Sequence, residues 1–241
     1  RGSKIQTLAC VINTWFHRMT RIYGKINYIC LTEFNKSKLL EFKQIKPEKV
    51  FVKPNFVVNE GSFVPKESRK NQFVFAGRLD KLKGVDILFE TWKRMGDNAP
   101  KLVVCGTGPM AEWCKEFIWQ NQVNIELKGF VLNIEIQKLI ANSKALVLPT
   151  QWYEGFPMSI VEAFSVGTPV ICSDIGNAGS IVIEGITGTK FESSSVDKMK
   201  QAVHRLQTYP EIYNTTFKAY CDNYTKQQNY QQLRNIYGDL R

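Results

Sequence analysis

Between residues 71 and 208, short runs that are apolar throughout alternate with longer segments in which apolar residues recur at helical spacing. The short runs have the length and β-branched content of buried strands, and the longer segments predict helices. The expected strands are 73–77, 101–106, 123–129, 145–150 and 169–173, and the expected helices are 85–92, 110–119, 133–142, 158–166 and 196–208. Apolar strands separated by helices are typical of a parallel sheet covered on both faces, so we predict an α/β fold with a doubly wound, Rossmann-like sheet.

The residues before position 59 follow a different pattern. They hold two strand-like runs and one helix after an amphipathic stretch, enough for a βαβ unit but too little for an independent sheet domain. The expected elements are helices at 5–23 and 35–44 and strands at 26–32 and 50–55. We therefore expect residues 1–58 to be the remnant of a second Rossmann-like domain, 59–70 a linker, 71–208 the main domain, and 209–241 a closing helix with helical spacing over 212–237.

The net charge of +10 is concentrated at one end of the chain. Residues 1–70 hold 14 basic and 5 acidic side chains (+9), whereas residues 71–241 hold 18 and 17 (+1). A nucleic-acid-coating surface needs positive charge over the folded body, so this distribution argues against a nucleic-acid partner. Apolar residues make up 44% of the chain, as in ordinary globular proteins, which excludes a disordered class.

The six cysteines are scattered without a C-x-x-C pair, and His17 and His204 are the only histidines. These residues indicate neither a zinc ligand set nor a Cys–His nucleophile, so we expect no metal site. Scattered cysteines fit a reduced compartment, and no apolar run approaches the ~18 residues needed to span a bilayer. We therefore expect a cytoplasmic location.

The most informative motif is E-G-F-P-M-S-I-V-E, which runs from Glu154 to Glu162 between an expected strand and an expected helix. Gly155 permits close approach of the backbone to a ligand. The amides of Met158 and Ser159 would lie at the positive end of the helix dipole, which favours anions. A capped loop with solvated glutamates would explain each residue alone, but the ordered set favours a ligand site at the carboxyl end of a strand.

A second motif, G-R-L-D-K-L-K-G at residues 77–84, also follows an expected strand and opens a helix. Arg78 can donate two parallel hydrogen bonds to a phosphate group, and Lys83 adds a compact positive charge beside it. Solvated surface charge is the simpler interpretation of a single lysine. Two cations at a strand end, with a second anion site two strands away, favour a phosphate-binding site.

A third motif allows a competing interpretation. The sequence G-T-G-P-M-A at 106–111 matches G-x-G-x-x-A after a strand, and Glu126 follows Gly108 by eighteen residues. This pattern is the dinucleotide fingerprint, so an NAD-dependent Rossmann oxidoreductase is the alternative hypothesis. Against it, the motif lies in the second βα unit rather than the first, and an NAD site leaves the other two motifs without a role.

Taken together, the motifs resemble the C-terminal domain of glycosyltransferase family 4. The set consists of G-R-L…K-G, G-T-G-P (106–109), K-G-F-V (128–131), E-x7-E and G-T-P-V (167–170), in this order and spacing, over roughly residues 26–190. The resemblance implies a retaining enzyme of GT-B architecture, with the active site between two Rossmann-like domains. It identifies 71–208 as the donor-binding domain and 1–58 as the end of the acceptor-side domain.

The resemblance also implies a role for each matching residue. Arg78 and Lys83 would bind the diphosphate of a nucleotide-sugar donor, Glu162 would bind the ribose hydroxyls, and Glu154 would lie near the transferred sugar. Arg78, Lys83 and Glu154 are the expected catalytic residues. The other expected donor-binding residues are Gly77, Gly129, Phe130, Val131, Gly155, Phe156, Met158 and Ser159. Because no D-x-D motif is present, cations would replace a metal as the diphosphate clamp, and we expect no cofactor.

The expected partners are a UDP-, GDP- or ADP-sugar and a glycan or lipid-linked acceptor, in the synthesis of a glycan such as a cell-envelope polysaccharide. The resemblance implies a hexosyl transfer of class EC 2.4. Because the acceptor side is incomplete, we expect the chain to bind a donor without turnover, and a non-catalytic nucleotide-sugar-binding module is a third hypothesis. The basic N-terminal part indicates peripheral association with an anionic membrane, whereas its amphipathic stretch is explained by packing on neighbouring helices.

Overall fold

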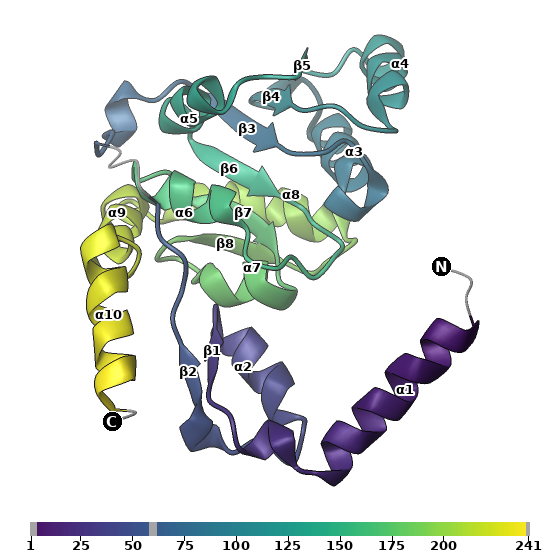
Figure 1. The fold of residues 1–241 in the computed structure, drawn as a ribbon. Coiled ribbons are helices and arrows are strands. Elements are labelled where there is room, and N and C mark those ends of the chain that lie inside the picture. The colour runs from purple at the N-terminus through teal and green to yellow at the C-terminus, as the bar shows by residue number, and fades with distance from the viewer. Residues whose placement is uncertain (1–3, 58–61, 240–241) are drawn as a thin grey trace.

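The computed structural model describes residues 4–57 and 62–239, and its main body is a six-stranded parallel sheet (Figure 1). The strand order is β5-β4-β3-β6-β7-β8, so the chain starts mid-sheet, builds one half, and crosses back to build the other. This reversal beside the first strand is the doubly wound arrangement, and it confirms the predicted α/β fold. The strands are β3 (Gln72–Ala76), β4 (Lys101–Cys105), β5 (Ile125–Gly129), β6 (Ala145–Leu148), β7 (Val170–Ser173) and β8 (Gly188–Phe191).

Helices cover both faces of the sheet, because alternate strand residues point to opposite sides. Phe73 and Phe75 of β3 share a buried cluster with α3, α4 and α8, whereas Val74 between them belongs to a second cluster with α5, α6 and α7. The helices are α3 (Val85–Met95), α4 (Ala111–Asn121), α5 (Asn133–Ala141), α6 (Met158–Phe164), α7 (Gly176–Ile181) and α8 (Val196–Arg205). Two cores on either side of one sheet explain why its central strands lack polar alternation.

The N-terminal part contains the expected βαβ unit. Strands β1 (Tyr28–Cys30) and β2 (Val50–Val52) pair in parallel as a separate two-stranded sheet, and α2 (Glu33–Leu40) connects them. The side chain of Thr32 accepts a hydrogen bond from the amide of Asn35 and so caps the start of α2. Helix α2 lies against α7, which fixes this unit on the main body.

Helix α1 (Lys4–Met19) extends away from the rest of the chain (Figure 1). None of its residues is buried, and Leu8, Trp15 and Met19 on its apolar side are 60%, 61% and 60% exposed. The expectation that this face packs on neighbouring helices is therefore wrong for the residues that the structure describes. The helix also ends earlier than predicted, because Arg21 adopts a left-handed conformation with φ 51°. None of the described helices is both long enough and apolar enough to cross a bilayer.

Three features of the second half of the chain differ from the sequence expectations. Helix α7 and strand β8 were not predicted from the sequence. Helix α7 contains Gly176 and Gly179, and β8 contains Lys190, so neither has the apolar pattern that marks the other elements. The expected closing helix is two helices, α9 (Ile212–Asn223) and α10 (Lys226–Asp239). The break occurs where the hydroxyl of Thr225 accepts a hydrogen bond from the amide of Gln228, as an N-cap residue does.

The second half of the expected linker is anchored to the main body by Arg69. This side chain is 6% exposed, and its guanidinium lies over the ring of Tyr213 at 5.0 Å. Burial lowers the pKa of Arg69 to about 10, so the side chain stays charged at neutral pH. Its hydrogen-bond acceptors are the carbonyl oxygens of Val64, Ala141, Ser143 and Val166 and the hydroxyl of Thr168. The loops after α5 and α6 therefore meet the linker at one cation.

Candidate functional site

The predicted site residues gather at one edge of the main sheet. Because β3, β4, β5 and β6 are parallel, their carboxyl ends bring four loops together (Figure 1). The loop after β3 carries Arg78 and Lys83, the turn after β5 carries Phe130, and the loop after β6 carries Glu154. Gly129 is the last residue of β5, and the other predicted residues lie in the same loops or in the first turns of α6, so the fold brings the separate motifs to a single region.

The loops after β3 and β4 are held together by backbone hydrogen bonds. The amide of Leu79 donates to Thr107 over 2.9 Å, and the amide of Met110 donates back to Leu79 over 3.0 Å. A Cβ atom on Gly106 would lie 1.8 Å from the carbonyl oxygen of Gly77, and one on Gly108 would lie 2.4 Å from that of Leu79. The glycines of G-T-G-P are therefore needed for contact between the two loops, which accounts for the fingerprint-like spacing without a dinucleotide.

A pocket of about 520 Å³ opens between these loops and the turn after β5. Four of the predicted residues line it, namely Gly77, Arg78, Phe130 and Val131. The side chain of Arg78 is 67% exposed and its Nε lies 3.1 Å from the carboxylate of Asp80. The Phe130 side chain is also exposed. An exposed cation and an apolar ring beside one pocket suit a ligand with both an anionic part and a flat part.

Lys83 and Glu154 form an ion pair with a distance of 2.6 Å between Nζ and Oε1. The pair is partly buried, with side-chain exposures of 31% and 15%. The hydroxyl of Thr150 donates a second hydrogen bond to the same carboxylate oxygen over 3.0 Å. Asp80 caps the short helix that carries Lys83 by accepting a hydrogen bond from its amide. The sequence predicted both members of this pair but not their contact, nor the part played by Thr150 and Asp80.

The predicted residues on α6 and just before it have a different environment. Phe156 and Met158 pack against the second core cluster, and Met158 and Ser159 are the first helical residues, whose amides have no acceptor within the helix. Glu162 lies one turn later and is half-buried, and burial raises the pKa of its carboxyl group above the ordinary value. Within residues 4–57 and 62–239, its carboxylate has no hydrogen-bond or ion-pair partner. Gly129 and Gly155 complete the predicted set, and both have open space where a Cβ would stand.

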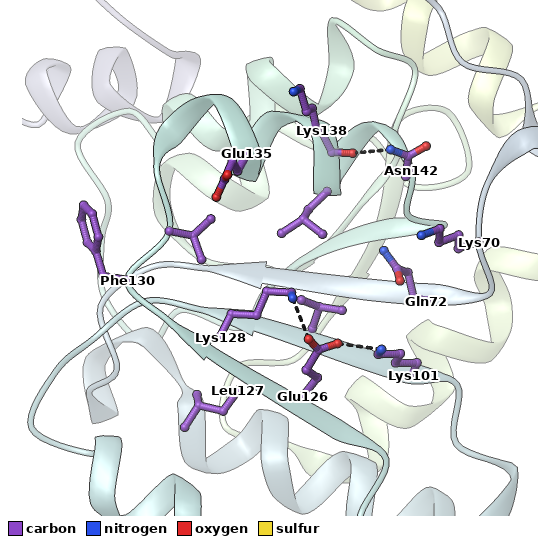
Figure 2. Close-up of a pocket in the computed structure, with 13 residues that line it drawn as sticks. Lys70, Gln72, Lys101, Glu126, Leu127, Lys128, Phe130, Glu135, Lys138 and Asn142 are labelled. Carbon is purple, nitrogen blue, oxygen red and sulfur yellow. Dashed lines mark hydrogen bonds and ion pairs between the residues drawn. The ribbon is translucent and has the colours of Figure 1, made fainter.

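Glu126 lies on β5, on the face of the sheet beneath α5, in a groove that Phe130 and Val131 also line (Figure 2). The groove has a volume of about 800 Å³, and Glu126 pairs there with Lys101 and Lys128, each at 2.6 Å. The hydrogen bond from Lys101, and then that from Lys128, lowers the pKa of Glu126. In the dinucleotide interpretation Glu126 should accept the ribose hydroxyls, but here two lysines already occupy its carboxylate.

Asn177 is another buried polar residue at the site that sequence reasoning missed. Its side-chain amide donates hydrogen bonds to the carbonyl oxygens of Glu154 and Gly155 over 2.6 and 2.5 Å. No pattern in the sequence marks it, because it lies on α7, a helix that the sequence did not predict. Asn177 therefore holds the backbone of the Glu154 loop, but it could not be identified by motif analysis.

The arrangement agrees with a comparison against known protein families. The family model described as glycosyl transferases group 1 matches residues 59–227, which is more than half of the chain. The chain belongs to this family. The segment of this group 1 glycosyltransferase that matches the model includes every loop at the carboxyl edge of the sheet. It therefore includes every predicted site residue.

Individual relatives agree with this assignment. The chain is 27% identical over 218 residues to an uncharacterized glycosyltransferase of Methanocaldococcus jannaschii, covering 88% of this chain and 59% of the relative. It is 28% identical over 196 residues to the UDP-Gal:alpha-D-GlcNAc-diphosphoundecaprenol alpha-1,3-galactosyltransferase of Escherichia coli, covering 74% of this chain and 50% of that enzyme. In both cases the chain spans less than two thirds of the relative's length.

The fold is also found in solved structures. The Anabaena protein HepE in complex with UDP superposes with a TM-score of 0.73 at 17% identity, covering 88% of this chain and 63% of that chain. At this identity the likeness concerns the fold alone. The six-stranded sheet is therefore the α/β sheet of a GT-B glycosyltransferase, and the group 1 family does not favour the NAD-dependent alternative.

Proposed function

We propose that this chain carries the donor site of a retaining, metal-independent glycosyltransferase of family 4, which transfers a hexosyl group from a nucleotide-diphosphate sugar. The observation that carries the proposal is the carboxyl edge of the sheet. There Arg78 lines a pocket, and Lys83 of the same loop forms a partly buried ion pair with Glu154 of the loop after β6. These are the loops in which a doubly wound sheet binds its ligand.

Each residue has a role that follows from its chemistry. In the reaction the bond from the sugar C1 to the diphosphate oxygen breaks, C1 forms a bond to an acceptor hydroxyl oxygen, and the proton of that hydroxyl passes to the leaving diphosphate. Negative charge grows on the leaving diphosphate, where Arg78 and Lys83 would stabilise it. One well-placed donor of this kind contributes about 3 kcal/mol to transition-state stabilisation. Glu154 would stand near the sugar, where positive charge develops.

Donor binding would exchange the partners of two cations. Lys83 is bonded to Glu154, and Arg78 to Asp80, so both cations are held in place by carboxylates. A diphosphate would replace these carboxylates and release Glu154 toward the sugar. Phe130 and Val131 would contact the base, and the half-buried Glu162 would accept hydrogen bonds from the ribose hydroxyls.

The relatives support the chemical class of both substrates. A structural neighbour binds UDP, and the Escherichia coli relative uses UDP-galactose with a diphosphoundecaprenol-linked acceptor. We propose that the donor is a UDP-, GDP- or ADP-sugar, and that the acceptor is a glycan or a lipid-linked sugar in the synthesis of a cell-envelope polysaccharide. The reaction would take place in the cytoplasm.

The exposed helix α1 supports a peripheral position on a membrane. Its apolar side is uncovered within the described part of the chain, and His17 and Arg18 lie in its last turn. Each suitably placed Lys or Arg adds about 1 kcal/mol of attraction to an anionic surface. Because transfer requires both reactants to be held together, the chain by itself is expected to bind a donor without turning over an acceptor. Acceptor-dependent transfer by the purified chain at an ordinary enzymatic rate would contradict that expectation.

The test of the donor site is calorimetric titration of the chain with UDP, GDP, ADP and NAD, once in the presence of EDTA and once with Mg²⁺. Binding of one nucleoside diphosphate, with no binding of NAD, supports the proposal. Binding of NAD alone would support the oxidoreductase, and a requirement for a divalent cation would contradict metal independence.

A further inference from the structure

The buried amide of Asn177 joins two parts of the chain that are far apart in sequence. The side chain is 1% exposed, and its oxygen accepts a hydrogen bond from the hydroxyl of Thr32, 145 residues away. Its nitrogen donates both protons, one to the carbonyl oxygen of Glu154 and one to that of Gly155. The amide thus connects the start of α2 to the loop that carries Glu154.

A second contact links the same two elements. The ring of Phe34, in the first turn of α2, lies 5.2 Å from the ring of Tyr153, the residue before Glu154. Gly176 leaves room for this aromatic pair, because a Cβ there would lie 2.8 Å from the ring of Tyr153. Helix α2 therefore contacts the Glu154 loop directly through rings and indirectly through Asn177.

We propose that Asn177 is a positioning residue, which couples the placement of α2 to the geometry of the Glu154 loop and hence to donor affinity. The inference rests on the proposed function, because it takes Glu154 and Gly155 as part of the donor site. Two consecutive carbonyl groups that accept from one nitrogen fix the orientation of both peptide planes. The direction in which the Glu154 side chain leaves the loop is fixed with them.

The coupling has to be reciprocal. If α2 docked on Asn177 raises donor affinity by some factor, a bound donor strengthens the docking of α2 by the same factor. In a GT-B enzyme the two sides of the active site belong to different domains. Such a link would make the geometry of the Glu154 loop depend on the position of the acceptor-side domain. If there is no such coupling, Asn177 only provides hydrogen bonds to the carbonyl groups of the loop.

The experiment compares Asn177→Ala, Thr32→Val and the double variant with a matched control, Asn229→Ala. Asn229 is also buried and also joins the N-terminal part to the main body. Its side-chain amide donates a hydrogen bond to the carbonyl oxygen of Pro54 over 2.6 Å and accepts one from Lys53 over 3.0 Å. Unlike Asn177, it lies on α10, away from Glu154. Thr32→Ser keeps the hydroxyl and serves as the conservative variant. Circular dichroism selects the variants that fold, and if Asn177→Ala does not, Thr32→Val and Thr32→Ser carry the test.

The first measurement is affinity for whichever of UDP, GDP and ADP the unsubstituted chain binds. We expect Asn177→Ala and Thr32→Val each to weaken binding at least about fivefold, the lower end of ordinary coupling. The double variant should lose less than the sum of the two single losses, because both substitutions remove the Thr32–Asn177 hydrogen bond, although Thr32→Val also removes the N-cap of α2. Thr32→Ser and Asn229→Ala should bind like the unsubstituted chain. Unchanged affinity in Thr32→Val, or an equal loss in Asn229→Ala, would overturn the proposal.

The second measurement is hydrogen exchange of the peptide covering residues 150–157 without ligand. We expect faster exchange there in Thr32→Val and Asn177→Ala, but not in Asn229→Ala. Exchange that stays unchanged in Thr32→Val would overturn the coupling even if nucleotides bind. If the unsubstituted chain binds none of the three nucleotides, the proposed donor site fails, while this second measurement still decides whether α2 and the loop are linked.

Discussion

Replacing Glu162 by glutamine is expected to weaken nucleotide binding and to stabilise the folded chain at the same time. The carboxylate is half-buried on α6 and has no partner within the described residues, and burial raises its pKa. The folded chain therefore holds this proton more tightly than the unfolded chain. The resulting contribution to stability is fully present below the ordinary glutamate pKa and is lost as pH rises through the folded value. At neutral pH the charged form penalises folding, and the uncharged amide removes that penalty.

The loss in binding follows from the number and type of hydrogen bonds. A hydrogen bond to a charged acceptor contributes about 1.5–3 kcal/mol. Glutamine keeps one acceptor oxygen in place but loses the charge, so the loss should equal about one such bond, roughly a 10- to 150-fold rise in Kd. A 2′,3′-dideoxy nucleotide never made these bonds and should lose much less.

The assay pairs calorimetry of ribonucleotide and dideoxynucleotide diphosphates with thermal unfolding at pH 7. Glu116→Gln, on the exposed side of α4, is the matched control for the change of charge and should alter neither quantity. Equal losses for the two ligand types, or a lower Tm for Glu162→Gln than for the unsubstituted chain, would refute the reasoning. The Glu162 carboxylate would then stabilise α6 and would not bind the ribose hydroxyls.

Three further predictions concern other parts of the chain. Arg78→Ala should weaken binding of the nucleoside diphosphate by about 1.5–3 kcal/mol in calorimetry, and unchanged affinity with intact circular dichroism would remove Arg78 from the site. Arg69→Met removes the hydrogen bonds of a buried cation and should cost about 3–5 kcal/mol, a fall in Tm of roughly 6–20 °C; a shift below 2 °C would contradict its anchoring role. In co-sedimentation, the protein should bind anionic vesicles at low salt and leave them at high salt, and binding indifferent to salt and lipid charge would exclude the membrane proposal.

The main sheet was predictable because burial on both faces leaves a simple signal. Leu146 and Leu148 face one core and Val147 the other, so β6 is apolar throughout and stands out from its surroundings. The same regularity places the motifs, since each one follows such a strand and parallel strands share a carboxyl edge. The roles assigned to the individual site residues stay predictions, because they came from the family resemblance.

The contacts between motifs were not predictable in the same way. Lys83 and Glu154 are separated by 71 residues and Thr32 and Asn177 by 145, and neither pairing leaves a periodic trace in the sequence. Asn177 lies on a helix with two glycines, whose propensity argues against the conformation that tertiary packing imposes. Local patterns report burial and turns, whereas these bonds depend on how distant elements meet.

The anchoring of Arg69 changes where this protein should be cut. A boundary drawn from the sequence pattern alone would start an isolated donor domain at residue 71, just before β3. Such a domain would lack the cation on which the carbonyl groups of Ala141, Ser143 and Val166 converge, and also Phe63, whose ring packs against Phe217. Those carbonyl groups would lose the hydrogen bonds that the charged Arg69 side chain donates to them. For protein engineering, a donor-domain fragment should therefore start before Phe63, so that Phe63 and Arg69 keep these contacts.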